Sequence, residues 1–154
     1  MRDKGIFILL SICLNFTVFA QEAKKGSYQG IIEVGGGVVC VDEQIASGFK
    51  ADFINGYKFN DCISIGLGVG VRKYSSDKEF IPLAYFNFRA NLGYNKFEKV
   101  YPYVQTGLGY PVLSQSVGLA FKNTPIAIGV YGEVVPFIYA SIYTSIGVSV
   151  GITF

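Results

Sequence analysis

Histidine is absent from all 154 residues of this chain, and that absence removes several classes of function at once. Without an imidazole there is no Ser-His-Asp or Cys-His arrangement, no histidine base and no common zinc cluster. An enzyme would have to rely on unusual carboxylate or tyrosine chemistry. We therefore expect a protein that is not an enzyme and that has no catalytic residues, metal site or cofactor.

Charged residues are also scarce, at 16% of the chain against roughly 25% in soluble domains. The net charge is only +2, and no cluster of Lys and Arg alternates with aromatic residues. Nucleic acid is therefore excluded as a partner. What the chain has instead is 51% hydrophobic residues, with nineteen Gly, thirteen Phe and eleven Tyr.

Long apolar runs are missing except near the N-terminus, where residues 6–19 follow two basic residues and lead to Ala20. This pattern predicts a cleaved signal peptide over residues 1–20. A transmembrane anchor is the alternative, but Asn15 interrupts a run shorter than the roughly 20 residues that a spanning helix needs. Cys13 suggests lipoprotein processing, but such processing usually requires a small residue before the cysteine, and Ile12 is bulky.

The mature chain is expected to form one domain, with a flexible lead over residues 21–26 and a folded part over residues 27–154. Its later apolar stretches alternate or are cut by Gly and charge, so none resembles a spanning helix. An exported chain of this composition can enter lipid only as a closed β-barrel, because lipid offers no partner to an unpaired strand edge.

Period-2 alternation recurs along the mature chain and is clearest in residues 62–74 and 139–154. In the last stretch Ile146, Val148 and Val150 share one face, whereas the other face is Gly and Ser. Eight such segments are predicted, and they are separated by connections at 42–43, 58–61, 75–79, 95–99, 111–114, 122–125 and 135–138. We predict an all-β, eight-stranded, antiparallel up-and-down transmembrane barrel.

Alternation alone does not say which face points outward. A soluble barrel that carries apolar ligands inside would need a charged exterior, yet the second face here is mostly Gly, Ser, Thr and Tyr. We therefore expect the apolar face to contact lipid. The soluble carrier stays as the less favoured alternative.

Aromatic residues gather at the expected strand ends, as in the two aromatic girdles of membrane barrels. The alternative is chance enrichment in strands. The predicted inner girdle is Tyr57, Phe59, Tyr94, Phe97, Tyr101 and Phe154, and the predicted outer girdle is Tyr74, Phe80, Tyr110, Phe137 and Tyr139.

Six charged residues fall on the inward face of the predicted strands. Because a lone charge inside a narrow barrel is costly, the three acids and three bases are expected to form a polar plug. A gated ion path, in which the pairs exchange partners, is the alternative. These residues are Glu33, Lys50, Asp52, Arg72, Arg89 and Glu133.

Cys40 and Cys62 remain after signal cleavage, and they are expected at opposite ends of the barrel. That separation exceeds the roughly 7 Å limit between the Cα atoms of a disulfide, so both are predicted to be free thiols.

The glycines of residues 66–70 do not precede a helix, and so do not form a phosphate-binding loop. We expect inward glycines to make room for larger neighbours.

Residues 27–154 resemble the small eight-stranded outer-membrane barrels of Gram-negative bacteria (OmpA/OmpX-like), in particular the barrel family abundant in Bacteroidetes. The resemblance rests on Gly-Tyr-Lys-Phe-Asn at 56–60, Ser-Ile-Gly-Leu-Gly-Val-Gly at 64–70, Ile-Pro-Leu at 81–83 and Asn-Phe-Arg at 87–89. It implies an outer-membrane location and varied or unknown roles. Outer-membrane barrel enzymes of similar fold rely on a histidine that this chain lacks, and its short outer loops argue against an adhesin-like role.

The expected partners are outer-membrane lipid and the barrel-assembly machinery, which would recognise the C-terminal strand. Phe154 resembles the terminal aromatic residue of that assembly signal. A monomer is expected. The predicted function is a non-enzymatic outer-membrane barrel with a plugged lumen and a structural or interaction role, and a narrow channel for ions or small solutes is the alternative.

Overall fold

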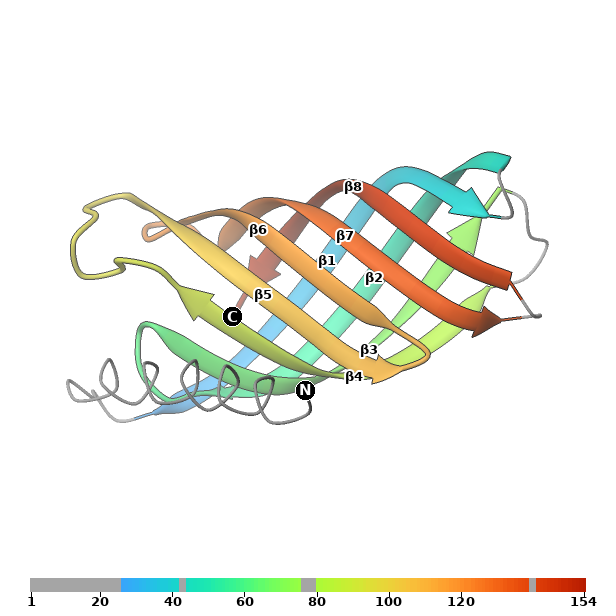
Figure 1. The fold of residues 1–154 in the computed structure, drawn as a ribbon. Coiled ribbons are helices and arrows are strands. Elements are labelled where there is room, and N and C mark those ends of the chain that lie inside the picture. Colours follow the sequence, from blue (N-terminus) through green and yellow to red (C-terminus); the bar gives the residue numbers. More distant parts are fainter. Residues whose placement is uncertain (1–25, 42–43, 76–79, 139–140) are drawn as a thin grey trace, which may run out of the picture.

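The computed structural model describes residues 26–41, 44–75, 80–138 and 141–154 (Figure 1). The predicted signal peptide lies outside these ranges, as do residues 42–43 and most of the loop predicted at 75–79. The strands are β1 (Ser27–Val41), β2 (Gln44–Lys58), β3 (Ile63–Tyr74), β4 (Ile81–Asn91), β5 (Val100–Tyr110), β6 (Leu113–Phe121), β7 (Ile126–Ile138) and β8 (Ser141–Thr153).

Each strand pairs with the next in antiparallel fashion, and β8 pairs with β1 to close the barrel. This confirms the predicted eight-stranded up-and-down topology. We call the end at which β1 starts and β8 stops the proximal end, and the other end the distal end. The connections at 59–62, 92–99 and 122–125 lie at the proximal end, on the left in Figure 1. Among the described residues, no helix is long and apolar enough to cross a membrane.

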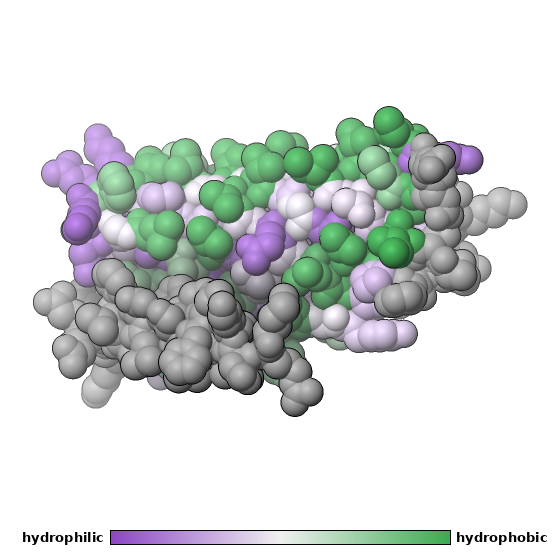
Figure 2. Space-filling model, in the orientation of Figure 1, coloured by the Kyte–Doolittle hydropathy of each residue, from purple (hydrophilic) through white to green (hydrophobic). Residues whose placement is uncertain are grey.

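The alternating pattern places large apolar side chains on the outside of the barrel. Leu67 is 59% exposed, Phe86 72% and Ile146 63%, while the charged residues between such positions are buried. Figure 2 shows apolar residues over much of the visible barrel wall and hydrophilic residues gathered at the proximal end. The distribution is the reverse of a soluble protein, in which polar groups face outward.

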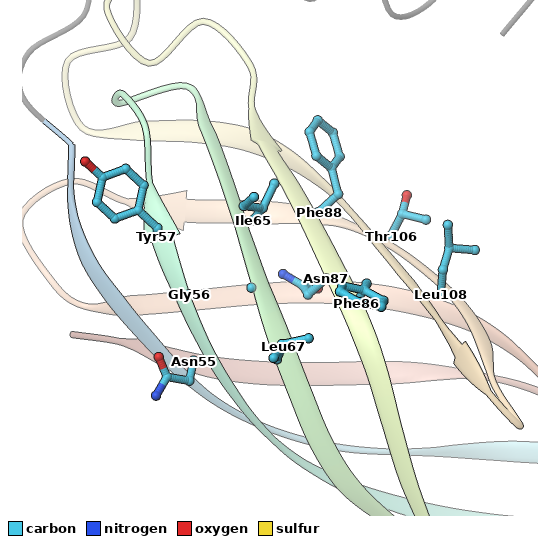
Figure 3. Close-up of a pocket in the computed structure, with 11 residues that line it drawn as sticks. Asn55, Gly56, Tyr57, Ile65, Leu67, Phe86, Asn87, Phe88, Thr106 and Leu108 are labelled. Atoms are coloured by element: carbon cyan, nitrogen blue, oxygen red, sulfur yellow. The ribbon is translucent and has the colours of Figure 1, made fainter.

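A shallow apolar groove of about 440 Å³ crosses the outside of β2 to β5 (Figure 3). Two rows of outward side chains border it. They are Tyr57, Ile65, Phe88 and Thr106 in one row and Asn55, Leu67, Phe86 and Leu108 in the other. Between the rows Gly56 pairs with Gly66, and a Cβ on Gly56 would lie 2.8 Å from the Gly66 Cα atom.

Inside the barrel, three buried tyrosines each pack against two glycines from nearby strands. A Cβ on Gly68 would lie only 2.4 Å from Tyr85 Cζ, so only glycine leaves space for that ring. The expectation that inward glycines make room for larger neighbours is confirmed. The groups are Tyr85 with Gly68 and Gly107, Tyr103 with Gly118 and Gly129, and Tyr131 with Gly35 and Gly147.

Strand β4 ends at Asn91, three residues earlier than the predicted segment 80–94. Gly93 has φ of 65°, a conformation that ends the strand and that L side chains rarely adopt. Its carbonyl oxygen accepts the amides of Lys96 and Phe97, which closes the turn. The turn therefore begins at Leu92 rather than at Asn95.

The predicted loops 111–114 and 135–138 are also shorter in the structure. Strand β6 already starts at Leu113, and β7 continues to Ile138 through Pro136. Its register with β8 shifts between Val135 and Ile138. A β-bulge accommodates a proline, which has no amide to donate to the neighbouring strand, so the predicted break at this proline is wrong.

The predicted aromatic girdles are realised in part. At the proximal end Tyr57, Phe59, Phe97 and Phe154 are exposed, and at the distal end Phe80 and Tyr110 are exposed. Tyr139 and the side chain of Phe137 lie outside the described residues.

Tyr74 is predicted to belong to the outer girdle, but it is only 2% exposed and stacks on Tyr143, with ring centroids 4.9 Å apart, so this prediction is wrong. The reason is its register, because Tyr74 has the same parity as the inward Arg72. Tyr101 is half-buried and packs against the interior cluster around Tyr103, so its ring is not wholly part of the proximal girdle either.

Both cysteines are free, as predicted. Cys40 is exposed near the distal end of β1, where it pairs in register with Ile45. Cys62 is half-buried at the proximal end, directly before β3.

Candidate functional site

The candidate site is the charged interior of the barrel. In a closed ring of eight strands, β1 lies across from β5 and β3 lies across from β7. Inward side chains from these pairs meet only in the lumen. Five of the six charged residues named from the sequence form one chain of ion pairs there, and the sixth, Arg89, lies apart.

The chain of ion pairs starts on β1 and ends on β7. Lys50 Nζ donates to Glu33 Oε1 and lies 3.6 Å from Asp52 Oδ2. Arg72 Nη1 donates to Asp52 Oδ1 at 2.8 Å, and its Nε and Nη2 donate to the two carboxylate oxygens of Glu133 at 2.7 Å each. All five residues are 2–4% exposed.

Local register explains why these side chains meet. Glu33 is the direct cross-strand neighbour of Asp52, and Lys50 is the neighbour of Arg72, so each adjacent pair starts with like charges. Like charges side by side are unfavourable in a sheet. In the lumen, an opposite charge separates the like-charged neighbours. Lys50, for example, contacts both Glu33 and Asp52.

Two contacts bridge the lumen along different diameters. Arg72 on β3 reaches Glu133 on β7, and Gln105 Nε2 on β5 donates to Glu33 Oε2 on β1 at 3.2 Å. The Lys50 ammonium also lies 4.3 Å from the centre of the Tyr131 ring. Polar side chains thus cross the interior between opposite strands.

Arg89 is 3% exposed and makes no ion pair with any residue that the structure describes. Its Nε donates to Asn91 Oδ1 at 3.2 Å, and its guanidinium lies 4.0 Å from the centre of the Tyr103 ring. The alternating sequence pattern predicts that the Arg89 side chain points inward, but it does not predict what that side chain contacts. The expected matching of three acids to three bases is therefore not the arrangement found, because two bases share the three acids.

Some buried acceptors close to these groups have no hydrogen-bond partner within the described protein. They include Asn87 Oδ1 and Gln105 Oε1, and Gln105 is the cross-strand neighbour of Arg89. Buried polar atoms of this kind are usual positions for bound water. The hydroxyl oxygens of Tyr74 and Ser149 are likewise buried without a partner, so unsatisfied polar atoms occur at several places in the described interior.

No three His, Cys, Asp or Glu residues of the described chain are grouped so that they could hold a metal ion. The interior carboxylates already accept from Lys50, Arg72 or Gln105. The chain of ion pairs is therefore suited to holding strands together, because each of its charges has an oppositely charged partner inside the barrel.

The fold and its interior define a class: an eight-stranded antiparallel β-barrel with an apolar wall and a polar core. Within that class, the solved structure of Neisserial surface protein A (NspA) superposes with a TM-score of 0.61 at 13% sequence identity, covering 85% of this chain and 100% of that chain. A structure reported as a de novo designed transmembrane β-barrel covers 85% of this chain and 98% of its own at 15% identity, but its TM-score is 0.41, too low to establish a shared fold.

No protein-family model matches the chain, and no curated protein matches its sequence. The similarity to NspA therefore establishes the fold alone. The finer resemblance to a Bacteroidetes family stays a prediction.

Proposed function

We propose that this chain is a non-enzymatic integral protein of the outer membrane of a Gram-negative bacterium, with a structural or interaction role and a lumen closed by its own side chains. One observation carries the proposal: exposed apolar residues surround the barrel while its charged residues are buried inside. Similarity in fold to NspA supports it.

An apolar wall of this extent favours lipid over water. Soluble monomers rarely expose a contiguous apolar patch larger than a few hundred Å². Each Å² removed from water contributes roughly 25 cal/mol, so a wall with Leu67, Phe86 and Ile146 between 59% and 72% exposed gains much from lipid. The closed ladder leaves no strand edge unpaired, which a hydrocarbon environment requires.

The expected partners follow from this placement. Outer-membrane lipid would cover the wall, including the groove across β2 to β5. The C-terminal strand would be the contact for the assembly machinery, and its Phe154 already pairs with Gly30, each amide donating to the other's carbonyl at 2.9 and 2.7 Å. A single closed barrel satisfies its own backbone, so we propose a monomer.

Heat-modifiable gel migration of outer-membrane fractions tests the membrane assignment. A folded, lipid-inserted barrel should migrate faster before heating than after, and it should need detergent for extraction. A mature chain that stays in solution without detergent would contradict the assignment and favour the soluble carrier.

A narrow channel is the second candidate function, and the buried polar atoms without a partner in the described interior are the observation that favours it. Conductance across planar bilayers separates the two. The plugged barrel should show no stable openings. Discrete openings that change in size with Arg89→Ala would establish the channel.

A further inference from the structure

The proximal mouth of the barrel holds a polar hollow of about 260 Å³ that is separate from the chain of ion pairs. Residues from β1, β2, β4 and β5 and from the connections at 92–99 and 122–125 line it, among them Gln29, Lys58, Asn91, Tyr94 and Lys122. None of the described residues that line the hollow is acidic. The hollow is therefore lined by basic and uncharged residues only.

Two lysines converge within the hollow. The Lys58 ammonium lies 5.5 Å and the Lys122 ammonium 4.4 Å from the centre of the Tyr94 ring. The ring is itself held edge-on against Tyr101, with centroids 4.8 Å apart. Both ammonium groups thus lie within 6 Å of the centre of one ring, and both lysines line the same hollow.

Positive charge is in excess at this mouth. Lys58 pairs with Asp61 at 2.7 Å, whereas no described acid lies within ion-pair distance of Lys122. Arg89 lies behind the hollow, linked to it through Asn91, whose Oδ1 accepts from Arg89 and whose Nδ2 donates to the Asp61 carbonyl. Of these three cationic groups, only Lys58 forms an ion pair with a described acid.

We propose that this mouth binds a phosphate-type oxyanion, with Lys58 and Lys122 as its direct contacts and Arg89 contributing charge from behind. A phosphate monoester carries about −1.5 to −2 charge at neutral pH, which matches the excess of positive charge. Its several oxygens suit lysines, which act as compact point charges with rotatable donors. The phosphate could belong to a soluble solute or to a phospholipid headgroup at the membrane surface.

The test is calorimetric titration of the folded, detergent-solubilised protein with inorganic phosphate, at ionic strength held constant with chloride. Saturable binding is expected. Lys122→Gln should weaken it at least about fivefold, the effect of one unit-charge contact in water, while Lys122→Arg should largely retain it. Lys96→Gln is the matched control, because it removes one exposed charge from the same rim outside the hollow.

Absence of saturable binding would overturn the proposal, and so would equal weakening by Lys122→Gln and Lys96→Gln, since that would report only the general charge of the rim. Competition then identifies the source of the phosphate. Displacement by short-chain phosphatidylglycerol but not by glycerol phosphate indicates a headgroup, and the reverse indicates a soluble solute. Heat-modifiable migration of each variant, measured in parallel, keeps a failure of this site distinct from a failure of the membrane assignment.

Discussion

Replacing Arg72 by methionine should destabilise the barrel more than any change to a surface charge. The substitution keeps an unbranched, flexible side chain but removes three charge-assisted hydrogen bonds, two to Glu133 and one to Asp52. Asp52 keeps Lys50 at 3.6 Å, whereas Glu133 loses its only ion pair among the described residues. The cost therefore comes chiefly from a carboxylate left alone inside the barrel.

The expected magnitude follows from that orphaned charge. Removing one partner of a buried ion pair typically costs about 3–5 kcal/mol, or roughly 10² to 10⁴ in the folding equilibrium. Arg72 and Glu133 are both 2% exposed, so solvent screening reduces this cost little. Changing Glu133 as well, to glutamine, removes the orphaned charge and should recover about 1–3 kcal/mol of the loss.

Reversible urea unfolding from lipid vesicles measures these free energies. Tyrosine emission is a usable signal because the chain has eleven Tyr and no Trp, and unheated gel migration gives a second one. Lys73→Met is the matched control on the same strand, expected to change stability by about 0.5 kcal/mol or less. A cost below about 1 kcal/mol for Arg72→Met, or a double variant as unstable as the sum of its two changes, would refute the role given to this pair.

Three further predictions follow from packing, solvent access and strand closure. Gly68→Ala should cost about 1–3 kcal/mol in the same unfolding assay, because its Cβ would meet the Tyr85 ring. Gly132→Ala is the control and should be nearly neutral, because nothing lies within 4 Å of the added Cβ. Equal costs for the two variants would contradict the packing argument. Burial raises the pKa of the Cys62 thiol, so its maleimide labelling should increase with pH to a midpoint above that of an ordinary thiol. The proximal end, which carries the predicted inner girdle, is expected to face the periplasm, so impermeant reagent should label Cys62 only after the outer membrane is opened; labelling on intact cells would reverse this orientation. Deleting Phe154 should lower outer-membrane yield more than it alters the stability of barrels that do insert, and normal yield would count against an assembly role.

Most of the fold could be predicted from period-2 alternation, because each strand has one consistently apolar face. Residues 62–74 are the clearest case, with glycines and Arg72 on one side and branched apolar residues on the other. Strand ends were less predictable. Gly93 ends β4 through its backbone conformation, and Pro136 is tolerated by a bulge, and neither effect is visible in a hydropathy pattern.

The alternation of side chains along each strand predicts which charged side chains point into the lumen, but it does not predict which of them form ion pairs with one another. Partners across the lumen depend on shear and strand tilt, which set the relative height of strands far apart in sequence. Arg72 and Glu133 are separated by 61 positions and meet, whereas Arg89 also points inward but forms no ion pair with a described residue and instead contacts Asn91 and the Tyr103 ring. The same alternation explains why Tyr74 points inward instead of joining the outer aromatic girdle, because it lies two residues after the inward Arg72 on the same strand.

The division of the lumen follows from where the carboxylates lie. Glu33, Asp52 and Glu133 all engage Lys50 or Arg72, so the polar crossing between opposite strands is complete there. Toward the proximal mouth the cations outnumber the carboxylates, and the excess faces solvent. The proposed plug and the proposed anion site would therefore depend on different residues, the plug on the chain of ion pairs and the anion site on Lys58 and Lys122.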